Sequence, residues 1–183
     1  MAIKEEAWRR GILRWKLDVN QQRVYDQIRA TGSGSFYFNK PRRIGGSYLE
    51  CLMAIEICLL KPRAQVKYAA PTAKAVRKII TPNIRKILED CPEDLKPKFS
   101  TIEQDWIFPN GSTLSVAGCD NGQFENLRGT EADAIFLDEV GFIDELKYIL
   151  SDVLMPQIQD TNGIIVLCST PARSPAHESF EIA

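Results

Sequence analysis

The chain has 183 residues, of which 44% are apolar and 26% charged, and its formal net charge is −1. These values exclude a disordered or fibrous protein and predict one soluble α/β domain with a sizeable core. Because the net charge is close to zero, any contact with nucleic acid must come from local clusters of Lys and Arg.

The cysteine and histidine content argues against a zinc site. The five cysteines include no C-x-x-C pair, and the chain has a single histidine, His177. Free thiols in a reducing compartment are therefore expected. The N-terminus lacks the apolar segment of a signal peptide, and the longest apolar stretch, Leu52–Leu60, is half of a membrane span. We expect a protein that stays inside a cell and off the membrane.

The first half of the chain alternates between helical and extended patterns. The cap Asp18 or Asn20 and the spacing of Val24 and Ile28 predict the first helix. In chain order we expect a helix from Val19, a strand at Phe36–Phe38, a helix at Tyr48–Leu60, a strand at Val66–Pro71, a helix capped by Thr72 that breaks at Pro82, and a second helix capped by Thr81 that runs to about Glu89.

The second half predicts a hairpin and two buried strands. Two strand-like runs flank Asn110–Gly111, a strong hairpin signal. The continuous apolar runs Ala134–Glu139 and Gly163–Pro171 are typical of strands buried on both faces of a parallel sheet. Residues 144–159 between them have helical periodicity. This alternation predicts an α/β fold with a mainly parallel central sheet flanked by helices.

The acid pair Asp138 and Glu139 ends an apolar strand. Open α/β sheets bind ligands at the carboxyl ends of their strands. One acid there can hold Mg²⁺, while its neighbour, facing the other way, can activate a water molecule. The alternative is a strand that simply ends in solvated acids.

A basic, glycine-containing loop lies between the first expected strand and the helix after it. Such a loop binds phosphate through glycines, a helix N-terminus, a cation and a hydroxyl group. Gly45 and Ser47 occupy the last Gly and Ser/Thr positions of G-x-x-x-x-G-K-[ST], whereas Gly46 stands in place of the Lys and Lys40 in place of the first Gly. Lys40, Arg42 or Arg43 can supply the missing charge from the other end of the loop. A basic turn without a ligand is the alternative.

These segments resemble the large terminase subunits that package viral DNA. In some members the phosphate loop lacks its standard Lys and carries basic residues early in the loop. The run from Asn126 to Val140, in which Arg128-Gly129 precedes the acids by about ten residues, is similar to the family, and so is Leu167–Pro171 after the next strand. The resemblance covers residues 15–175 and implies an ASCE-type P-loop NTPase that hydrolyses ATP with Mg²⁺.

The resemblance also implies a role for each residue of the site. Ser47 and Asp138 would hold Mg²⁺, Glu139 would be the general base, and Arg128 would contact the γ-phosphate within one subunit or across a subunit boundary. The residues expected to bind nucleotide are Lys40, Arg42, Arg43, Gly45, Gly46, Ser47, Ser169 and Thr170, with Gln21 or Gln22 reading adenine and Trp15 or Tyr25 stacking on it. Arg128, Ser169, Thr170 and the glutamines are alternatively ordinary surface or turn residues.

The implied partners are double-stranded DNA, a portal protein, a small terminase subunit and copies of the chain in a ring, in the cytoplasm of an infected host. The exposed cations Lys74, Arg77, Lys78 and Arg85 share a helical face that either contacts DNA or is simply solvated.

We expect residues 1–34 to form a helical segment beside the adenine and residues 35–183 to form the P-loop core. No cluster of acids follows Pro171, so we expect a truncated motor domain without the C-terminal nuclease.

Two other functions remain open on the sequence alone. The Gly at position 46 favours a non-catalytic nucleotide-binding or DNA-binding subunit whose loop has degenerated. The Ala70-Pro71-Thr72 and Ser169-Thr170-Pro171 segments are also similar to helicase-type ATPases, although these usually keep the loop Lys.

Overall fold

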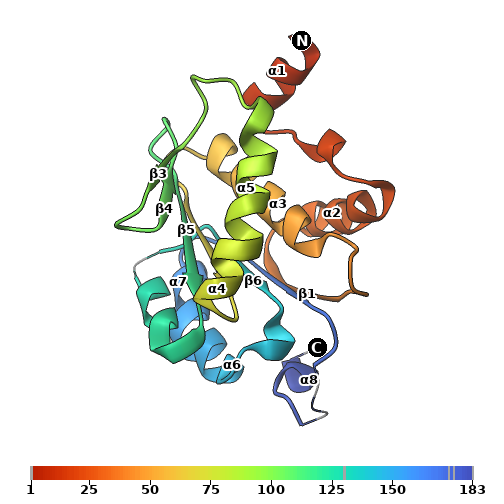
Figure 1. Ribbon diagram of the computed structural model, residues 1–183, viewed down its shortest axis with the longest axis vertical. Coiled ribbons are helices and arrows are strands. Elements are labelled where there is room, and N and C mark those ends of the chain that lie inside the picture. Colours follow the sequence, from red (N-terminus) through yellow and green to blue (C-terminus); the bar gives the residue numbers. More distant parts are fainter. Residues whose placement is uncertain (1, 130, 173, 175, 183) are drawn as a thin grey trace.

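A single seven-stranded sheet organises the molecule (Figure 1). The computed structural model describes residues 2–129, 131–172, 174 and 176–182. The strand order is β1-β7-β6-β2-β5-β4-β3. The strands are β1 (Gly34–Asn39), β2 (Gln65–Ala70), β3 (Lys98–Ser100), β4 (Asp105–Ile107), β5 (Thr113–Gly118), β6 (Ala134–Asp138) and β7 (Ile164–Ser169). Neighbours from β1 to β5 in this order pair in parallel, whereas the pairs β5–β4 and β4–β3 are antiparallel, and this mainly parallel sheet confirms the predicted fold class.

Helices cover both faces of this sheet. The α-helices are α1 (Ala2–Arg9), α2 (Val19–Thr31), α3 (Gly46–Leu60), α4 (Ala73–Ala75), α5 (Thr81–Ile87), α6 (Leu146–Tyr148), α7 (Met155–Gln159) and α8 (Ser179–Ile182). The 3₁₀ segments are η1 (Arg14–Lys16), η3 (Leu88–Asp90), η4 (Asp120–Leu127) and η5 (Val140–Phe142), and the π-helical turns are η2 (Val76–Ile80) and η6 (Ile149–Leu154). None of the helices in the described residues is long and apolar enough to cross a membrane.

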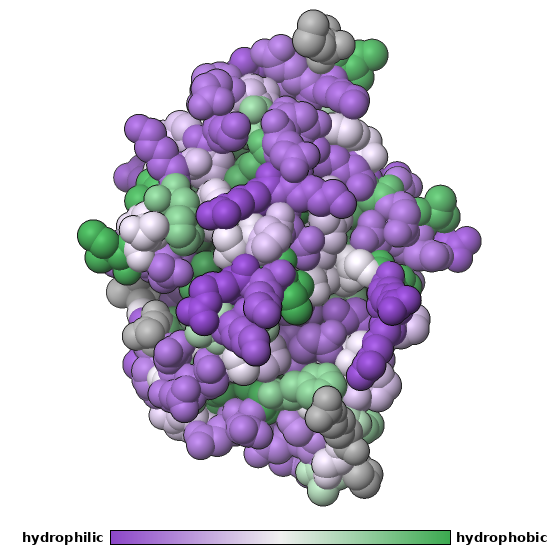
Figure 2. Space-filling model, viewed as in Figure 1, coloured by the Kyte–Doolittle hydropathy of each residue, from purple (hydrophilic) through white to green (hydrophobic). Residues whose placement is uncertain are grey.

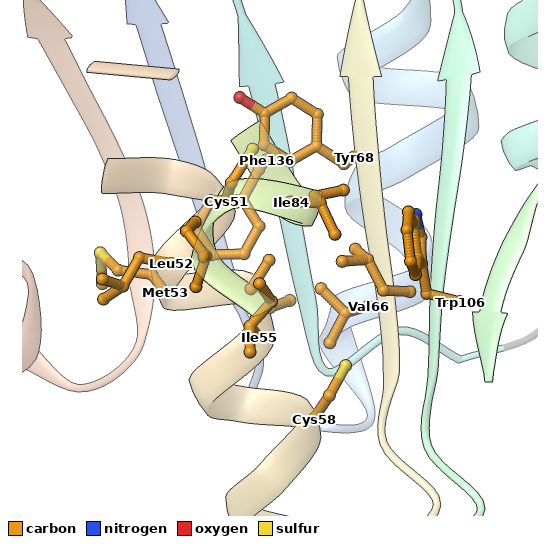
Figure 3. Packing of buried hydrophobic residues seen from close by; sticks show 14 of the residues in the cluster. Cys51, Leu52, Met53, Ile55, Cys58, Val66, Tyr68, Ile84, Trp106 and Phe136 are labelled. Atoms are coloured by element: carbon orange, nitrogen blue, oxygen red, sulfur yellow. The ribbon is translucent and has the colours of Figure 1, made fainter. Parts of the chain in front are cut away.

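The central strand β6 contributes to two separate cores because its side chains alternate between the faces of the sheet. Phe136 joins the larger cluster, which packs under α2, α3 and α5, and its ring stacks on that of Tyr68 with 6.1 Å between centroids (Figure 3). Ile135 and Leu137 point the other way, into the cluster under η4, α6 and α7. Burial on both faces explains the continuous apolar run of this strand.

The long helical column from α4 to α5 corrects one prediction. Thr72 caps it as expected, since its Oγ1 accepts a hydrogen bond from the N–H of Ala75. The expected break at Pro82 does not occur, and Thr81 has helical dihedral angles rather than those of a cap. The N–H of Thr81 instead bonds to the carbonyl of Val76 across the π-helical turn η2. This wider turn, placed directly before the proline, relieves the clash that ends an ordinary helix.

Further predictions agree with the structure, and several short elements were not anticipated. Helix α2 begins at Val19 and is capped by Asp18, and β4 and β5 form the hairpin around Asn110. All five cysteines are free and buried. The sequence reading did not include α1, β3 or η4.

The face crossed by α4, η2 and α5 is mainly hydrophilic (Figure 2). Lys74, Arg77, Lys78 and Arg85 are exposed on this column, whereas Ile80 and Ile84 are buried beneath it. The column is therefore amphipathic, as its sequence pattern predicts.

Candidate active site

Three parallel strands bring the predicted site residues to one edge of the sheet. The carboxyl ends of β1, β7 and β6 lie side by side, with Phe38 paired to Cys168 and Cys168 paired to Asp138. The basic loop leaves β1 at this edge, and the backbone N–H of Lys40 donates to the carbonyl of Ser169 at 2.8 Å. Segments about 90 residues apart in the sequence thus meet, as the acid pair and the loop together predict.

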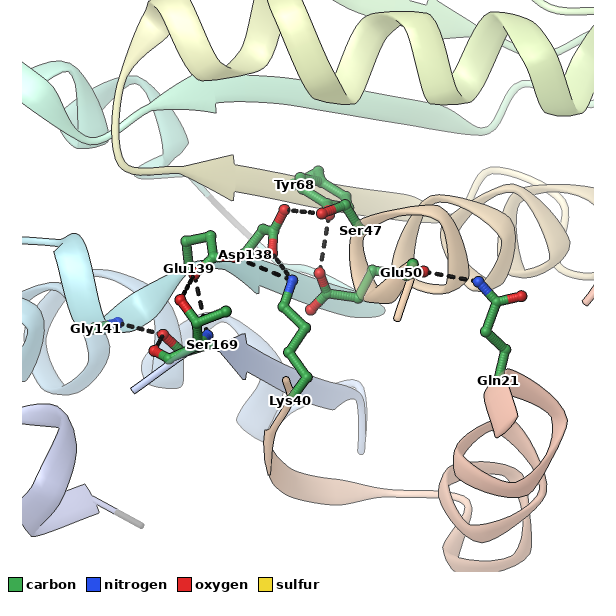
Figure 4. Close-up of polar contacts among 11 residues, drawn as sticks. Gln21, Lys40, Ser47, Glu50, Tyr68, Asp138, Glu139, Gly141 and Ser169 are labelled. Carbon is green, nitrogen blue, oxygen red and sulfur yellow. Dashed lines mark hydrogen bonds and ion pairs between the residues drawn. The ribbon is translucent and has the colours of Figure 1, made fainter. Parts of the chain in front are cut away.

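Lys40 is the loop cation that contacts the acids (Figure 4). Its side chain is only 7% exposed, and its Nζ lies 3.1 Å from Asp138 Oδ1 and 3.2 Å from Glu139 Oε1. Burial lowers the pKa of Lys40, but the negative charge of Asp138, with those of neighbouring groups, raises it overall. The amine is therefore a protonated cation held between two carboxylates.

The position of Lys40 explains why residue 46 is a glycine. A Cβ atom at Gly46 would lie 2.6 Å from Lys40 Cδ, 2.8 Å from Cys168 Sγ and 3.1 Å from Lys40 Nζ. A side chain at position 46, where the usual loop Lys stands, would therefore occupy the space that Lys40 fills. The two departures from the usual motif compensate each other.

Asp138 and Ser47 provide a set of hard oxygen ligands. The Oγ of Ser47 donates a hydrogen bond to Asp138 Oδ2, so a hydroxyl group and a carboxylate converge at the start of α3. Hydroxyl and carboxylate oxygens suit Mg²⁺, which prefers oxygen ligands and keeps several waters. The donor set at this point fits the magnesium site that the resemblance implies.

Glu139 differs from the prediction in its direction. It was expected to face away from Asp138, but it has a left-handed backbone with φ of 53°, which ends the strand's alternation and lets both acids reach Lys40. Its Oε2 accepts hydrogen bonds from the N–H and Oγ1 of Thr170, at 3.1 and 2.8 Å. Burial raises the pKa of Glu139, but the bonds from Thr170 and the charge of Lys40 lower it overall. The acid is thus held as a carboxylate, the form in which a general base acts.

Ser169 and Thr170, at the end of β7, both lie at this edge. The Oγ of Ser169 accepts a hydrogen bond of 2.9 Å from the N–H of Gly141, just after the acids. The two residues therefore fix the segment that follows β6, consistent with their predicted place beside the site.

An open cavity of about 490 Å³ lies over the loop. Its lining includes Lys40, Arg42, Arg43, Ser47, Glu139 and Thr170. The side chains of Arg42 and Arg43 are exposed, and Arg43 has a positive φ of 69°. The cavity is therefore lined both by exposed cations and by the carboxylate of Glu139.

Glu50 and Tyr68 belong to the same cluster and were missed by the sequence reading. Glu50 lies one helical turn after Ser47, is fully buried, and accepts a hydrogen bond of 2.9 Å from the Tyr68 hydroxyl. Among the residues that the structure describes, none forms a hydrogen bond with its Oε1. Burial, and secondly the charge of Asp138, raises the pKa of Glu50 well above its ordinary value. An acid in an otherwise apolar helix, one turn after the loop hydroxyl, was the available signal.

The two candidate adenine-reading glutamines are engaged elsewhere. Gln21 Nε2 donates to the carbonyl of Gly45 at 2.9 Å, and Gln22 Nε2 donates to the carbonyl of Leu17 at 2.9 Å. Neither glutamine lines the cavity over the loop. Of the two possible stacking partners, Tyr25 is buried with its hydroxyl bonded to Glu56, and Trp15 is partly exposed beside Lys16.

Arg128 is not brought to the acids within this chain. Its Nε lies 2.6 Å from Glu125 Oε2 and its Nη2 lies 3.1 Å from the Tyr148 hydroxyl. Its side chain is half exposed, and it does not line the cavity. The structure thus provides no contact within one subunit between Arg128 and the cavity.

Three features define the class of P-loop NTPases. They are a mainly parallel sheet, a strand–loop–helix whose loop carries a buried lysine, and an acid pair on a nearby strand. Residues 37–156 match the family model described as terminase large subunit, T4likevirus-type, N-terminal, and the chain belongs to this family. A comparison with curated proteins finds no match.

Solved large terminases share the fold at low sequence identity. The large terminase of the thermophilic bacteriophage D6E has a TM-score of 0.70 and 14% identity over 91% of this chain and 42% of that one. That of bacteriophage HK97 has a TM-score of 0.67 and 17% identity over 88% of this chain and 34% of that one. The chain thus spans less than half of either protein. The D6E protein in complex with ADP has a TM-score of 0.56 and 14% identity over 83% of this chain and 39% of that one.

Proposed function

We propose that this domain hydrolyses ATP and that the motor to which it belongs couples hydrolysis to the movement of double-stranded DNA into a viral procapsid. The observation that carries the proposal is the contact of Lys40 with both Asp138 and Glu139 beside Ser47. This arrangement brings a cation, a carboxylate–hydroxyl pair and a candidate base into contact at one edge of the sheet, and these are the parts that phosphoryl transfer requires. The ADP complex of the D6E large terminase is consistent with it.

Each residue of the site has a distinct task in this proposal. Lys40, Arg42 and Arg43 bind the phosphates, together with the backbone of Gly45 and Gly46. Ser47 and Asp138 hold Mg²⁺, which when bound offsets the charge on the phosphate oxygens.

Glu139 accepts a proton from the water that attacks the γ-phosphorus, and the products are ADP and inorganic phosphate. The hydrogen bonds from Thr170 orient this carboxylate. Thr170, with Ser169, thereby connects the state of the site to the end of β7.

The remaining parts of the proposal concern the assembled motor. Arg128, whose guanidinium lies away from the cavity of its own chain, acts on the site of a neighbouring subunit in a ring. Double-stranded DNA, a portal protein and a small terminase subunit are the partners, in the cytoplasm of the infected host. The exposed cations of α4, η2 and α5 provide positive charge that could contact the DNA backbone.

Steady-state ATP hydrolysis tests the catalytic proposal. We expect Glu139→Gln to abolish turnover while ATP still binds, because the amide cannot accept the proton but keeps the size of the side chain. Glu131→Gln is the matched control, since Glu131 is exposed and does not line the cavity.

Three outcomes contradict parts of the proposal. Turnover that survives Glu139→Gln removes Glu139 from the role of base. A wild-type protein that binds ATP without hydrolysing it is a degenerate nucleotide-binding subunit. Strand unwinding coupled to hydrolysis identifies a helicase instead of a packaging motor.

A further inference from the structure

The side chain of Gln21 links two backbone groups that belong to different elements. Its Oε1 accepts from the N–H of Asp18 at 3.0 Å, and its Nε2 donates to the carbonyl of Gly45 at 2.9 Å. These bonds fix the orientation of the amide. In the reverse orientation the amide NH₂ would face the N–H of Asp18, and the amide oxygen would face the carbonyl of Gly45. Gln21 is 8% exposed, so solvent cannot easily replace either bond.

The carbonyl that Gln21 contacts lies where the loop becomes helix α3. Gly45 is the N-cap of α3 and has a left-handed backbone, with φ of 77° and ψ of 30°. Its carbonyl also accepts from the N–H of Leu49 at 3.1 Å, the first hydrogen bond of the helix. A Cβ at position 45 would lie 2.3 Å from Gln21 Nε2, so the glycine permits this close approach. The first N–H groups of a helix have no partner within it and can bind an anion. The carbonyl of Gly45 therefore sets the direction in which α3 presents them.

Helix α2 holds Gln21 in place. Asp18 Oδ1 accepts from the N–H of Gln21 at 2.9 Å, which with the bond above forms a reciprocal cap at the start of α2. Further along, the Tyr25 hydroxyl donates to Glu56 Oε2 on α3 at 2.8 Å, and the N–H of Leu13 donates to Glu56 Oε1. The segment 13–25 is thus bonded at both of its ends to one residue of α3, Glu56, and these bonds hold Gln21 in place relative to α3.

We infer, resting on the proposed function, that Gln21 is a positioning residue. It holds the carbonyl of Gly45, and with it the first turn of α3, in the conformation that binds a triphosphate. This effect does not depend on which base the triphosphate carries. This role differs from reading adenine, because substituting a residue that contacts adenine weakens the binding of adenine nucleotides only. The amide reaches the loop backbone, and it does not line the cavity over the loop.

Binding of three ligands to the full chain separates the two roles. The ligands are ATP, GTP and inorganic tripolyphosphate, each with Mg²⁺. Calorimetry measures the affinity of the wild type and of each variant for each ligand. Gln21→Glu keeps the acceptor for Asp18 but places a carboxylate against the carbonyl of Gly45, and Gln21→Ala removes both bonds. Gln27→Ala is the control, because Gln27 is an exposed glutamine of the same helix and does not line the cavity over the loop. Thermal unfolding shows whether each variant is folded at the assay temperature.

We expect both Gln21 variants to weaken the binding of all three ligands by the same factor, about tenfold, because one net hydrogen bond has about this effect. Gln27→Ala should leave the binding of all three ligands unchanged. Weaker ATP binding with unchanged GTP and tripolyphosphate binding would overturn the inference in favour of adenine reading. Unchanged binding of all three by a folded Gln21→Glu protein overturns it as well. Failure of the wild type to bind any of the ligands is a different result, which removes the proposed function and the inference with it.

Discussion

Replacing Gly46 with alanine tests whether Lys40 occupies the place of the usual loop lysine. The added Cβ would lie 2.6 Å from Lys40 Cδ and 2.8 Å from Cys168 Sγ, whereas non-bonded carbon atoms prefer about 3.5–4.0 Å. Cys168 is buried in β7 and cannot easily move, so Lys40 must shift by about 1 Å. Such a shift separates its ammonium group from Asp138 and Glu139, which it now contacts at 3.1 and 3.2 Å.

The size of the effect follows from the cost of overpacking. One extra methyl group in a filled interior costs about 1–3 kcal/mol. If that cost falls on the conformation that binds phosphate, ATP affinity drops about 5- to 150-fold. We expect Gly46→Ala to show this loss in equilibrium binding of Mg-ATP. Adding Cys168→Ala should recover part of it, because the second substitution removes the Sγ atom that blocks the new Cβ.

Gly32→Ala provides the matched control. Gly32 has a positive φ of 79°, and a Cβ there would meet no atom within 4 Å. It should lower stability through backbone strain, by about 1–2 kcal/mol, and leave ATP affinity unchanged. Full ATP affinity in a folded Gly46→Ala protein would refute the idea that Lys40 and Gly46 compensate each other.

Two further predictions concern the acids around Lys40. Burial and the charge of Asp138 raise the pKa of Glu50 well above its ordinary value, so the folded chain binds a proton that the unfolded chain releases above about pH 4.5. The free energy of unfolding should therefore fall as the pH rises from about 4.5 to the raised pKa of Glu50. In denaturant titrations, Glu50→Gln should remove up to about 1.4 kcal/mol per pH unit of this slope. An unchanged slope in the variant would contradict this prediction. Thr170→Val removes a hydrogen bond that lowers the pKa of Glu139, so the acid limb of the pH–rate profile should move to higher pH. A limb at the wild-type pH would show that Glu139 does not control it.

Much of the fold was predictable because its strands are buried on both faces. The runs that become β6 and β7 are continuously apolar, and their order with the helices between them specifies a parallel sheet. The path through Pro82 was not predictable, because a local pattern does not reveal a π-helical turn. Strand β3 has only three residues, and it exists by pairing with β4.

The candidate site shows the same division between local and long-range information. The loop and the acid pair each have a local pattern, and their meeting follows from the parallel sheet. The choice of Lys40 over the neighbouring arginines depends on the space beside Gly46, which involves Cys168 from β7. The ion pair of Arg128 with Glu125 is local, since the two residues are three apart, whereas its bond to Tyr148 joins separate elements and no motif near Arg128 indicates it.

The two ion pairs of Lys40 have a thermodynamic consequence for any ligand of the cavity. The chain supplies its own acids with a counter-ion, and in the proposed function the same group binds the phosphates. If the proposed function holds, nucleotide binding is an exchange of partners, in which Lys40 leaves the carboxylates as it meets the phosphates. The measured affinity is then the difference between these two associations, and it is smaller than the full interaction of Lys40 with the phosphates.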